Sequence, residues 1–432
     1  MFHTIFSAPA VARRRAVAAC LSTVLIAPGG FAFAADPPLT LARAQQLAVD
    51  QSRLVNAKDY AAQSARDMAV AAKQLPDPVL KVGIDNLPVN KQDRFSLTRD
   101  FMTMRRVGLM QELTRSDKRR LRAERFEGEA DKSLAEKTVV AAAVERDTAL
   151  AWLDRYYADA VSALISEQIT QARLEVQWAQ SAYRGGKGNQ ADIFIARSAL
   201  AALEDQASDS ERRAGNARIA LARWIGDAAQ LPLGAKPPVD TVSLDEASLE
   251  TQLGHHPELA VLARQEAIAN TEARLAQANK KADWTVEVAL QKRGDMYSDM
   301  LSVGLSVPLQ WGQKNRQDRE LSAKLSQVEQ AKAEREDALR MHVAEVRAML
   351  NEWHADRMRR ARYSDELTPL AGSRTTATVA AYRGGKATLA DVLAARRAEI
   401  DLRLQALRLE QETDRLWAQL NFLFPRHSGM NH

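Results

Sequence analysis

The chain lacks most of the residues and motifs on which disulfide-bonded, membrane-helical or catalytic proteins depend. It contains a single cysteine, which excludes an intramolecular disulfide. No stretch of eighteen uninterrupted apolar residues follows the N-terminal region, so no transmembrane helix is predicted there. No HExxH, P-loop or nucleophile-elbow motif occurs, and no group of His, Asp or Glu has a recognised ligand spacing. We therefore predict no enzymatic activity, no cofactor and no metal site.

Residues 1–34 have the pattern of a secretory signal peptide. Three arginines precede a short apolar run that ends in an A-x-A site, so cleavage is expected between Ala34 and Ala35. Removal of this segment takes away three arginines and no acids, which lowers the formal net charge from +5 to +2. The small remaining charge removes the main reason to expect a nucleic-acid partner. Cys20 lies inside the segment, and a membrane anchor or lipidation at this cysteine stays open as an alternative.

A short motif occurs twice in the chain. The stretch AYRGGKGNQADIFIAR at 182–197 returns as AYRGGKATLADVLAAR at 381–396, with ten of sixteen positions identical and an offset of 199 residues. A glycine pair allows a helix to end and the chain to reverse within few residues. Each copy is therefore predicted to be the tip of a long helical hairpin.

The similarity extends to an internal twofold repeat that covers most of the chain. Each half is predicted to form a helix, two strands, a very long helix, a tip and a returning helix, in that order. The predicted parts are repeat 1 (35–230, strands about 79–86 and 104–113, tip 183–192), a Pro-rich linker (231–254), repeat 2 (255–425, strands about 284–292 and 300–310, tip 382–391) and a short tail (426–432).

Two segments are predicted to form unusually long helices. Residues 116–182 contain no proline and one glycine, which at 1.5 Å per residue corresponds to a rod of about 100 Å. In the second copy, 314–382, Pro369 should kink or locally break the helix. A 4-3-4-3 spacing of apolar residues there indicates a coiled-coil seam, formed by Leu339, Val343, Val346, Leu350 and Trp353.

The four strand segments alternate apolar with small or polar residues over about ten positions, which suits a membrane-spanning β-strand. Half-buried hairpins of a soluble domain fit the alternation equally well. Four strands cannot close a transmembrane barrel, because such barrels begin at about eight strands. If these strands span a membrane, several copies of the chain must share one barrel.

The signal peptide, the repeated element order and the paired tips resemble the TolC-like family of outer-membrane efflux ducts, over roughly residues 36–424. The family's tip pattern is matched in the second half by Tyr382, Gly385, Asp391, Val392 and Leu393, and in the first half by Tyr183, Gly186, Asp192 and Ile193.

The resemblance implies a mainly α protein with a membrane β-barrel, located in the Gram-negative outer membrane and extending into the periplasm. It implies a homotrimer with a twelve-stranded β-barrel among the outer-membrane lipids and an α-barrel of long coiled-coil helices below it. It further implies a passive exit duct, served by an inner-membrane RND-type pump and a periplasmic adaptor that docks at the tips.

The acidic residues of the tips allow two interpretations. Asp192 and Asp391 come just after the turns, where a carboxylate caps a helix and favours its positive dipole end. Alternatively, threefold symmetry would turn each into a ring of charge at a closed aperture, and the resemblance implies that Tyr382 bonds to Asp192 there. Ala387 and Ala394 replace an arginine gate residue and a second acidic ring found in some relatives.

Positive charge and glycine dominate the surface of both tips. The basic residues are either solvated turn charges or contacts for acidic groups of an adaptor. The predicted docking residues are Arg184, Gly185, Gly186, Lys187, Arg383, Gly384, Gly385 and Lys386.

The sequence allows two interpretations of the cargo. The segment 75–113 resembles the branch of the family that serves heavy-metal exporters, and thioethers are soft ligands suited to Cu(I) or Ag(I). Methionine at strand ends and loops is more often plain apolar surface, so both interpretations stay open. The residues concerned are Met102, Met104, Met110, Met296 and Met300.

Two histidine groups give no metal prediction. His342 and His354 are too far apart on one helix, and His255 and His256 precede Pro257 in a helix-capping context. The alternative function is a periplasmic coiled-coil adaptor, which has hairpins of similar length but needs a compact β-rich body.

Overall fold

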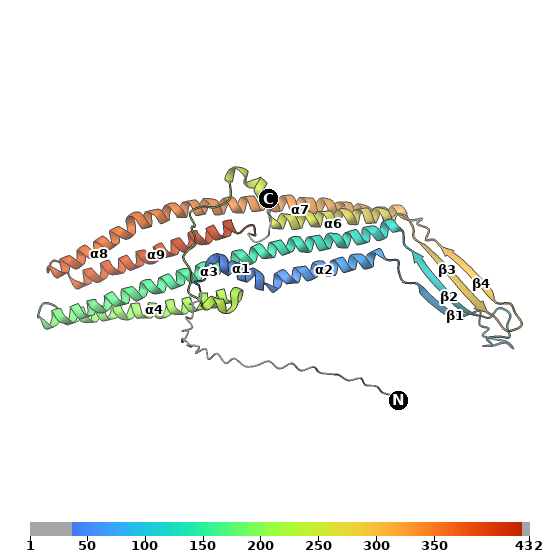
Figure 1. Cartoon of the computed structure of the whole chain (residues 1–432), viewed down its shortest axis with the longest axis horizontal. Coiled ribbons are helices and arrows are strands. Elements are labelled where there is room, and N and C mark those ends of the chain that lie inside the picture. The colour runs from blue at the N-terminus through green and yellow to red at the C-terminus, as the bar shows by residue number, and fades with distance from the viewer. Residues whose placement is uncertain (1–36, 426–432) are drawn as a thin grey trace, which may run out of the picture. The chain divides into compact units, whose positions relative to one another are not determined.

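A computed structural model describes residues 37–425; the predicted signal peptide with Ala34 and Ala35, and the predicted tail, lie outside this range. Within it, the order helix, two strands, long helix, tip, returning helix occurs twice (Figure 1). The elements are α1 (Leu41–Gln51), α2 (Arg53–Lys73), β1 (Val79–Asp85), β2 (Met104–Leu113), α3 (Ser116–Arg184), α4 (Gln190–Ile225), η1 (Gly226–Gln230), η2 (Glu246–Ser248), α5 (Leu249–Leu253), α6 (Pro257–Asn279), β3 (Trp284–Lys292), β4 (Met300–Ser306), η3 (Gln313–Asn315), α7 (Gln317–Arg362), η4 (Tyr363–Leu367), α8 (Thr368–Arg383) and α9 (Leu389–Asn421).

The two long helices differ in continuity. α3 runs for 69 residues without interruption, about 100 Å at the ordinary helical rise. Its counterpart is divided into α7 and α8 by a π-helical turn, η4, which lies directly before Pro369. Proline lacks an amide hydrogen and its ring crowds the carbonyl four residues back, so an extra residue in the turn relieves the conflict. The local break expected at this proline is therefore present.

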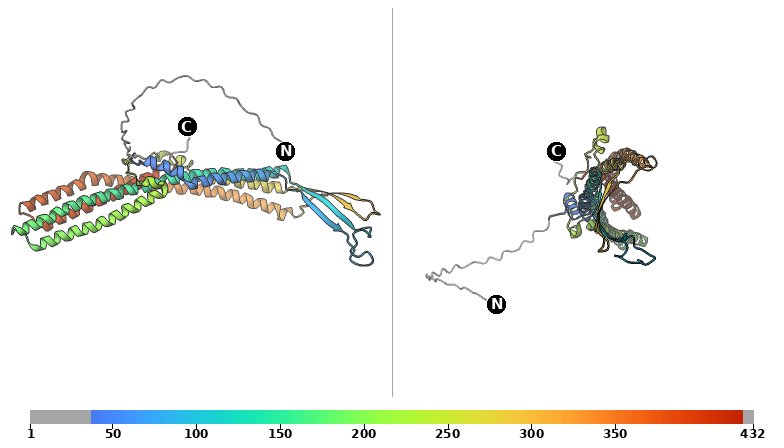
Figure 2. Two further views of the ribbon diagram at one scale, coloured as in Figure 1. Left: turned by 60° about the horizontal axis from the view of Figure 1, so that its bottom comes forward. Right: turned by 90° about the vertical axis from the view of Figure 1, so that its right-hand side faces the viewer.

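The helices pack around one apolar core near the middle of their length. Trp152 and Tyr157 of α3 are fully buried there, beside the side chains of α7 and α9. The predicted seam on α7 is part of this core, because Val346 and Trp353 are buried within it. From this core the hairpins α3–α4 and α8–α9 run side by side to their tips (Figure 2).

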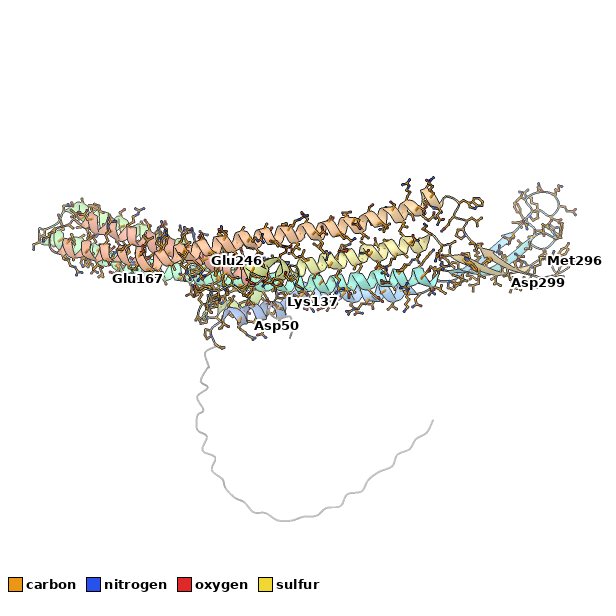
Figure 3. All side chains as sticks on the ribbon, turned by 90° about the horizontal axis from the view of Figure 1, so that it is seen from above. Asp50, Lys137, Glu167, Glu246, Met296 and Asp299 are labelled. Carbon is orange, nitrogen blue, oxygen red and sulfur yellow. The ribbon has the colours of Figure 1, made fainter. Side chains whose placement is uncertain are left out.

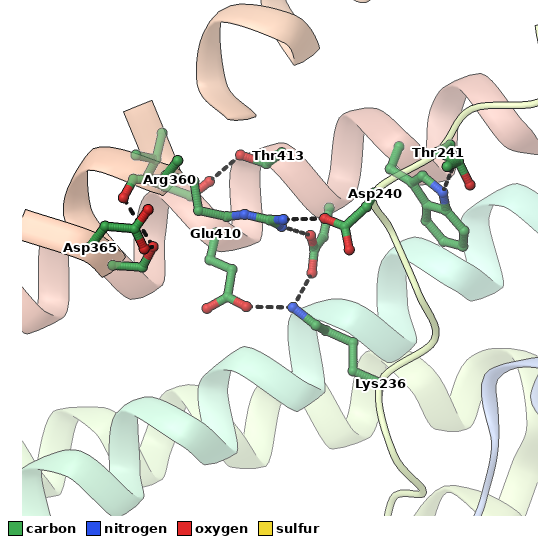
Figure 4. A network of polar contacts seen from close by, with 12 residues as sticks. Lys236, Asp240, Thr241, Arg360, Asp365, Glu410 and Thr413 are labelled. Atoms are coloured by element: carbon green, nitrogen blue, oxygen red, sulfur yellow. Dashed lines mark hydrogen bonds and ion pairs between the residues drawn. The ribbon is translucent and has the colours of Figure 1, made fainter. Parts of the chain in front are cut away.

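The predicted linker 231–254 is packed against the helices. It contains η2 and α5, and a polar network attaches its first part to α7 and α9 (Figure 4). Lys236 pairs with Asp414 of α9 at 3.0 Å, and Arg360 of α7 pairs both with Asp414, at 3.5 Å, and with Asp240. Asp414 is fully buried, so its charge depends on these partners.

The four strands form one antiparallel sheet in the order β1–β2–β3–β4. Pairing of β2 with β3 joins the two halves of the chain, with Leu109 opposite Val288. β4 ends at Ser306, four residues earlier than predicted, because Pro308 has no amide for the ladder. The sheet lies at the end of the helices opposite to the tips (Figure 1).

One face of this sheet is apolar and exposed. Val82, Val107, Leu290 and Leu301 form a row across all four strands, and between 52% and 72% of each side chain is accessible. The neighbouring row has the same character and consists of Leu80, Leu109, Val288 and Val303. Exposed apolar patches of this extent mark surfaces that contact lipid or another protein.

The opposite face is polar. Glu287 of β3 pairs with Lys81 of β1 at 2.9 Å and with Arg106 of β2, and Arg106 also lies 3.8 Å from Asp85. Successive side chains of a strand point to opposite faces, so these charges lie behind the apolar rows. No helix among the described residues is both long and apolar enough to cross a membrane.

Candidate functional site

Both helical tips reverse the chain through the same backbone motif. At the first tip, Lys187 N–H donates to Ala182 C=O at 2.9 Å and Gly186 N–H donates to Tyr183 C=O at 3.1 Å. This bond pair is the Schellman motif, which requires a positive φ at its central residue. Gly186 supplies it with φ 68°, whereas Gly185 has φ −81° and an ordinary conformation.

The second tip repeats this geometry residue for residue. Lys386 N–H donates to Ala381 C=O at 2.8 Å, Gly385 N–H donates to Tyr382 C=O at 3.0 Å, and Gly385 has φ 70°. Only the second glycine of each pair therefore needs to be glycine for conformational reasons.

The two acidic residues of the tips lie in capping boxes. Asp192 N–H donates to the Asn189 side chain at 2.9 Å, and the Asp192 carboxylate accepts from Asn189 N–H at 3.2 Å. Asp391 and Thr388 exchange the corresponding bonds, of 3.2 Å and 2.8 Å, at the start of α9. Bonds from the Thr388 side chain and backbone lower the pKa of the Asp391 carboxyl. Both carboxylates therefore stabilise the turns of their own chain.

The two tip tyrosines have different surroundings. Tyr382 packs against a small buried cluster formed by Ala179, Ala196 and Leu389, which joins α3, α4 and α9. Burial and, after it, the charge of Asp192 raise the pKa of the Tyr382 hydroxyl.

Tyr382 therefore keeps its proton at neutral pH near Asp192, although no hydrogen bond between them occurs in the described part of the chain. Tyr183, the matching residue of the first tip, is 48% exposed. Tyr382 thus lies between the two hairpins of its own chain, whereas Tyr183 is accessible to a further contact.

The four basic residues of the tips are exposed. Arg383 lies over the ring of Trp178 on α3, with its guanidinium carbon 5.2 Å from the ring centre. Within residues 37–425, the side chains of Arg184, Lys187 and Lys386 form no ion pair or hydrogen bond. Three of the four predicted docking charges are therefore available to a partner, whereas Arg383 is held against the neighbouring hairpin.

A buried ion pair behind the tips was not predicted from the sequence. Glu175 of α3 is 2% exposed and accepts from Arg396 Nε of α9 at 3.1 Å. Burial raises the pKa of the Glu175 carboxyl, while Arg396 opposes this rise. Arg396 also lies 4.0 Å from Glu399, which pairs with Arg403 at 2.7 Å. This ion pair connects α3 to α9, and Arg396 lies five residues after Asp391 along α9.

A cavity of about 750 Å³ lies beside this pair. It is lined by α3, α4 and α9, with the half-exposed Phe194 and Ile195 on its α4 side. In the sequence these two residues follow the predicted tip 183–192, but only the helix packing shows that they line a cavity.

The methionines considered as metal ligands are spread over the sheet end. Met110 lies within β2, opposite Val79 and Glu287, and Met102 precedes this strand. Met296 is 91% exposed in the β3–β4 connection, beside Asp299 at the far end of the sheet (Figure 3). Exposure of this kind fits apolar surface as well as a transient metal contact.

Comparison with known proteins gives structural but no sequence relatives. No protein-family model matches the chain, and no curated protein matches it. The outer membrane protein VceC from Vibrio cholerae is similar in structure with a TM-score of 0.70 at 18% identity, over 89% of this chain and 95% of VceC.

Two further solved structures are similar to this chain over most of its length. CusC, described in connection with transmembrane channel formation, has a TM-score of 0.74 at 14% identity, over 88% of this chain and 91% of CusC. The open state of the MtrE outer membrane channel of Neisseria gonorrhoeae has a TM-score of 0.69 at 15% identity, over 89% of this chain and 88% of MtrE. The helical hairpins, the four-stranded sheet and these likenesses together confirm that the chain has the fold of the TolC-like outer-membrane channels.

Proposed function

We propose that the protein is the outer-membrane exit duct of a tripartite efflux pump and acts as a homotrimer. The observation that carries this proposal is the exposed apolar face of the four-stranded sheet. Lipid cannot satisfy open backbone edges, so β1 and β4 need partner strands if the sheet spans a bilayer. Three copies supply twelve strands, which leave a lumen wide enough for a duct.

The polar face of the sheet fits the lumen of such a barrel. The ion pairs among Lys81, Arg106 and Glu287 would line the water-filled interior, as expected for a transmembrane barrel. The internal repeat would give each protomer two similar hairpins, and three protomers would build an α-barrel that extends into the periplasm.

The helical tips would form the closed end of the tube. Asp391 is exposed at the start of α9 and remains ionised, so three copies would place a ring of charge around the aperture. Asp192 and Tyr382 lie near one another between adjacent hairpins of one chain. We propose that these three residues form the gate.

The free basic residues of the tips would meet the adaptor. Arg184, Lys187 and Lys386 are exposed, and they surround the glycine turns at the extreme end of each hairpin. An adaptor that carries acidic side chains on its own hairpin would complement them, and an inner-membrane RND-type pump would supply the energy. Heavy-metal cations are our favoured cargo, and drugs are the alternative.

The adaptor alternative has no support in the fold. It required a compact β-rich body, whereas the strands of the described residues form one four-stranded sheet at the end of long helices. A periplasmic adaptor would also lack the large exposed apolar face that the sheet of this chain presents.

A charge-placement experiment tests the proposal. Leu301→Lys puts a charge on the apolar face of β4, and Ser302→Lys puts the same charge one residue along, on the opposite face. A lysine facing the bilayer midplane costs about 2–4 kcal/mol, whereas one facing the lumen costs little. Only Leu301→Lys should reduce the heat-modifiable trimer in the outer-membrane fraction.

Chemical cross-linking and negative-stain imaging of the extracted protein complete the test. We expect a trimer about 100 Å or more in length, from the rise of α3. A water-soluble monomer or dimer, or equal effects of the two lysine variants, would overturn the proposal.

A further inference from the structure

Three potential metal ligands, from two segments distant in the sequence, meet beside the first turn of α6. His256 is the N-cap of this helix, Glu258 lies in its first turn, and His342 comes from the middle of α7. One ligand atom of each residue lies within 4.8 Å of those of the other two. The sequence indicated only the capping role of His256, which is present as a bond of 3.4 Å from Glu258 N–H to His256 Nδ1.

The distances between the potential ligand atoms would admit an ion after small movements of the side chains. His342 Nε2 lies 3.0 Å from the Glu258 carboxylate, and the rings of His342 and His256 are 4.7 Å apart between their centres. Zinc–ligand bonds of about 2.0–2.2 Å in a tetrahedral site place ligand atoms roughly 3.3 Å from one another. The ligand atoms, which are at most 4.8 Å apart, would therefore have to approach one another by at most about 1.5 Å.

The three residues differ in burial. His256 is buried, His342 is half-buried and Glu258 is exposed, so the site would be open to water on the side of Glu258.

The local charge is nearly balanced before an ion is added. Arg146 and the positive end of the α6 dipole oppose a cation, whereas Glu258 supplies a carboxylate at the same place. Glu345 adds a second carboxylate, 3.6 Å from His342 Nδ1. A carboxylate on the outer nitrogen of a histidine orients the ring and leaves Nε2 for the metal.

We propose that His256, Glu258 and His342 form a site for a divalent cation of the zinc class. Two imidazoles and one carboxylate suit zinc, cobalt or nickel, whereas magnesium and calcium prefer oxygen ligands and monovalent copper prefers sulfur. Three protein ligands leave the fourth tetrahedral position to water. The proposal does not rest on the duct function, since it concerns a resident ion between two helices.

The bound ion would fasten α6 to α7 where the chain beyond α9 also arrives. The His256 ring makes an edge contact with Phe424, with 5.7 Å between the ring centres. Ion binding would therefore stabilise the junction of three segments that are remote in sequence.

Titration of the untagged, detergent-purified mature chain with Co²⁺ tests the site. We expect one saturable Co²⁺ per chain, with the visible absorption of a tetrahedral ion and displacement by Zn²⁺. His342→Asn should abolish this absorption, and Glu258→Gln should weaken binding at least tenfold. His354→Asn is the matched control, because His354 is an exposed histidine of the same helix whose only partner at ion-pair distance among residues 37–425 is Glu246.

A second variant protects the test against misfolding. His256→Asn keeps a residue that caps helices well but removes the imidazole, so it should fold, assemble and lose the Co²⁺ absorption. Absorption that persists in both His256→Asn and His342→Asn would overturn the proposal, as would the absence of saturable binding in the unaltered chain. Zn²⁺ should also raise the Tm of the unaltered chain and leave that of His256→Asn unchanged.

Discussion

Loss of the arginine in the buried pair behind the tips should loosen the attachment between the hairpins. Arg396→Met keeps the length of the side chain but removes the only cation within 4.0 Å of the Glu175 carboxylate among the described residues. Breaking a buried pair by deleting one partner typically costs about 3–5 kcal/mol, because the remaining charge stays buried.

Protonation of Glu175 sets an upper limit to this cost. A carboxyl with an ordinary pKa of 4.5 can be neutralised at pH 7 for about 3.4 kcal/mol. The expected loss of local stability is therefore about 3 kcal/mol at pH 7. It should shrink as the pH falls toward 4.5, because the carboxyl is then protonated whether the hairpins are docked or apart.

Hydrogen exchange followed by mass spectrometry measures this local stability directly. Backbone amides of α3 and α9 around the pair should exchange about 100-fold faster in Arg396→Met at pH 7, after correction for intrinsic rates. Arg397→Met is the control, since Arg397 is exposed on the same helix and pairs only loosely with Asp401 at 4.0 Å. An unchanged exchange rate in Arg396→Met, or a change of equal size at pH 5, would refute the reasoning.

Three further predictions concern the tips and the start of α6. Gly385→Ala should destabilise its turn by about 1–2 kcal/mol because of its positive φ, whereas Gly384→Ala should have little effect, and equal Tm shifts would contradict this. Asp391→Ala should raise cation conductance in planar bilayers, whereas Thr388→Ala, which weakens the same cap but keeps the charge, should not; equal conductances in both would remove the gate role. Because the pKa of the His256 ring is lowered, the neutral ring contributes up to about 3 kcal/mol to the free energy of unfolding. This contribution is complete above pH 6.5 and is lost as the pH falls toward about 4. A Tm profile from pH 8 to 4 that is as steep in His256→Asn as in the unaltered chain would exclude this cause.

Features that depend on local sequence were predictable. The Gly-Gly motifs indicated the tips because only glycine readily adopts the positive φ of a Schellman turn, as Gly186 and Gly385 do. The alternation of apolar and polar residues indicated all four strands, and the bounds differ mainly where Pro308 ends β4.

Features that depend on the register of one helix against another were not predictable. Glu175 and Arg396 are ordinary charged residues of long polar helices until packing brings them together. His256 and His342 likewise give no recognisable ligand spacing, because the spacing is set by the contact between α6 and α7. The prolines of 231–254 indicated a linker, but its attachment to the helices through the network around Lys236 could not be read from them.

The open edges of the sheet have a consequence for how the protein reaches its final state. β1 and β4 each carry backbone groups that the described chain leaves without a strand partner. If the proposed function is correct, a lone chain could not enter the hydrocarbon layer, because these groups would lose water without gaining hydrogen bonds. Association would have to precede or accompany insertion, so the yield of the duct should rise steeply with the concentration of newly exported chains.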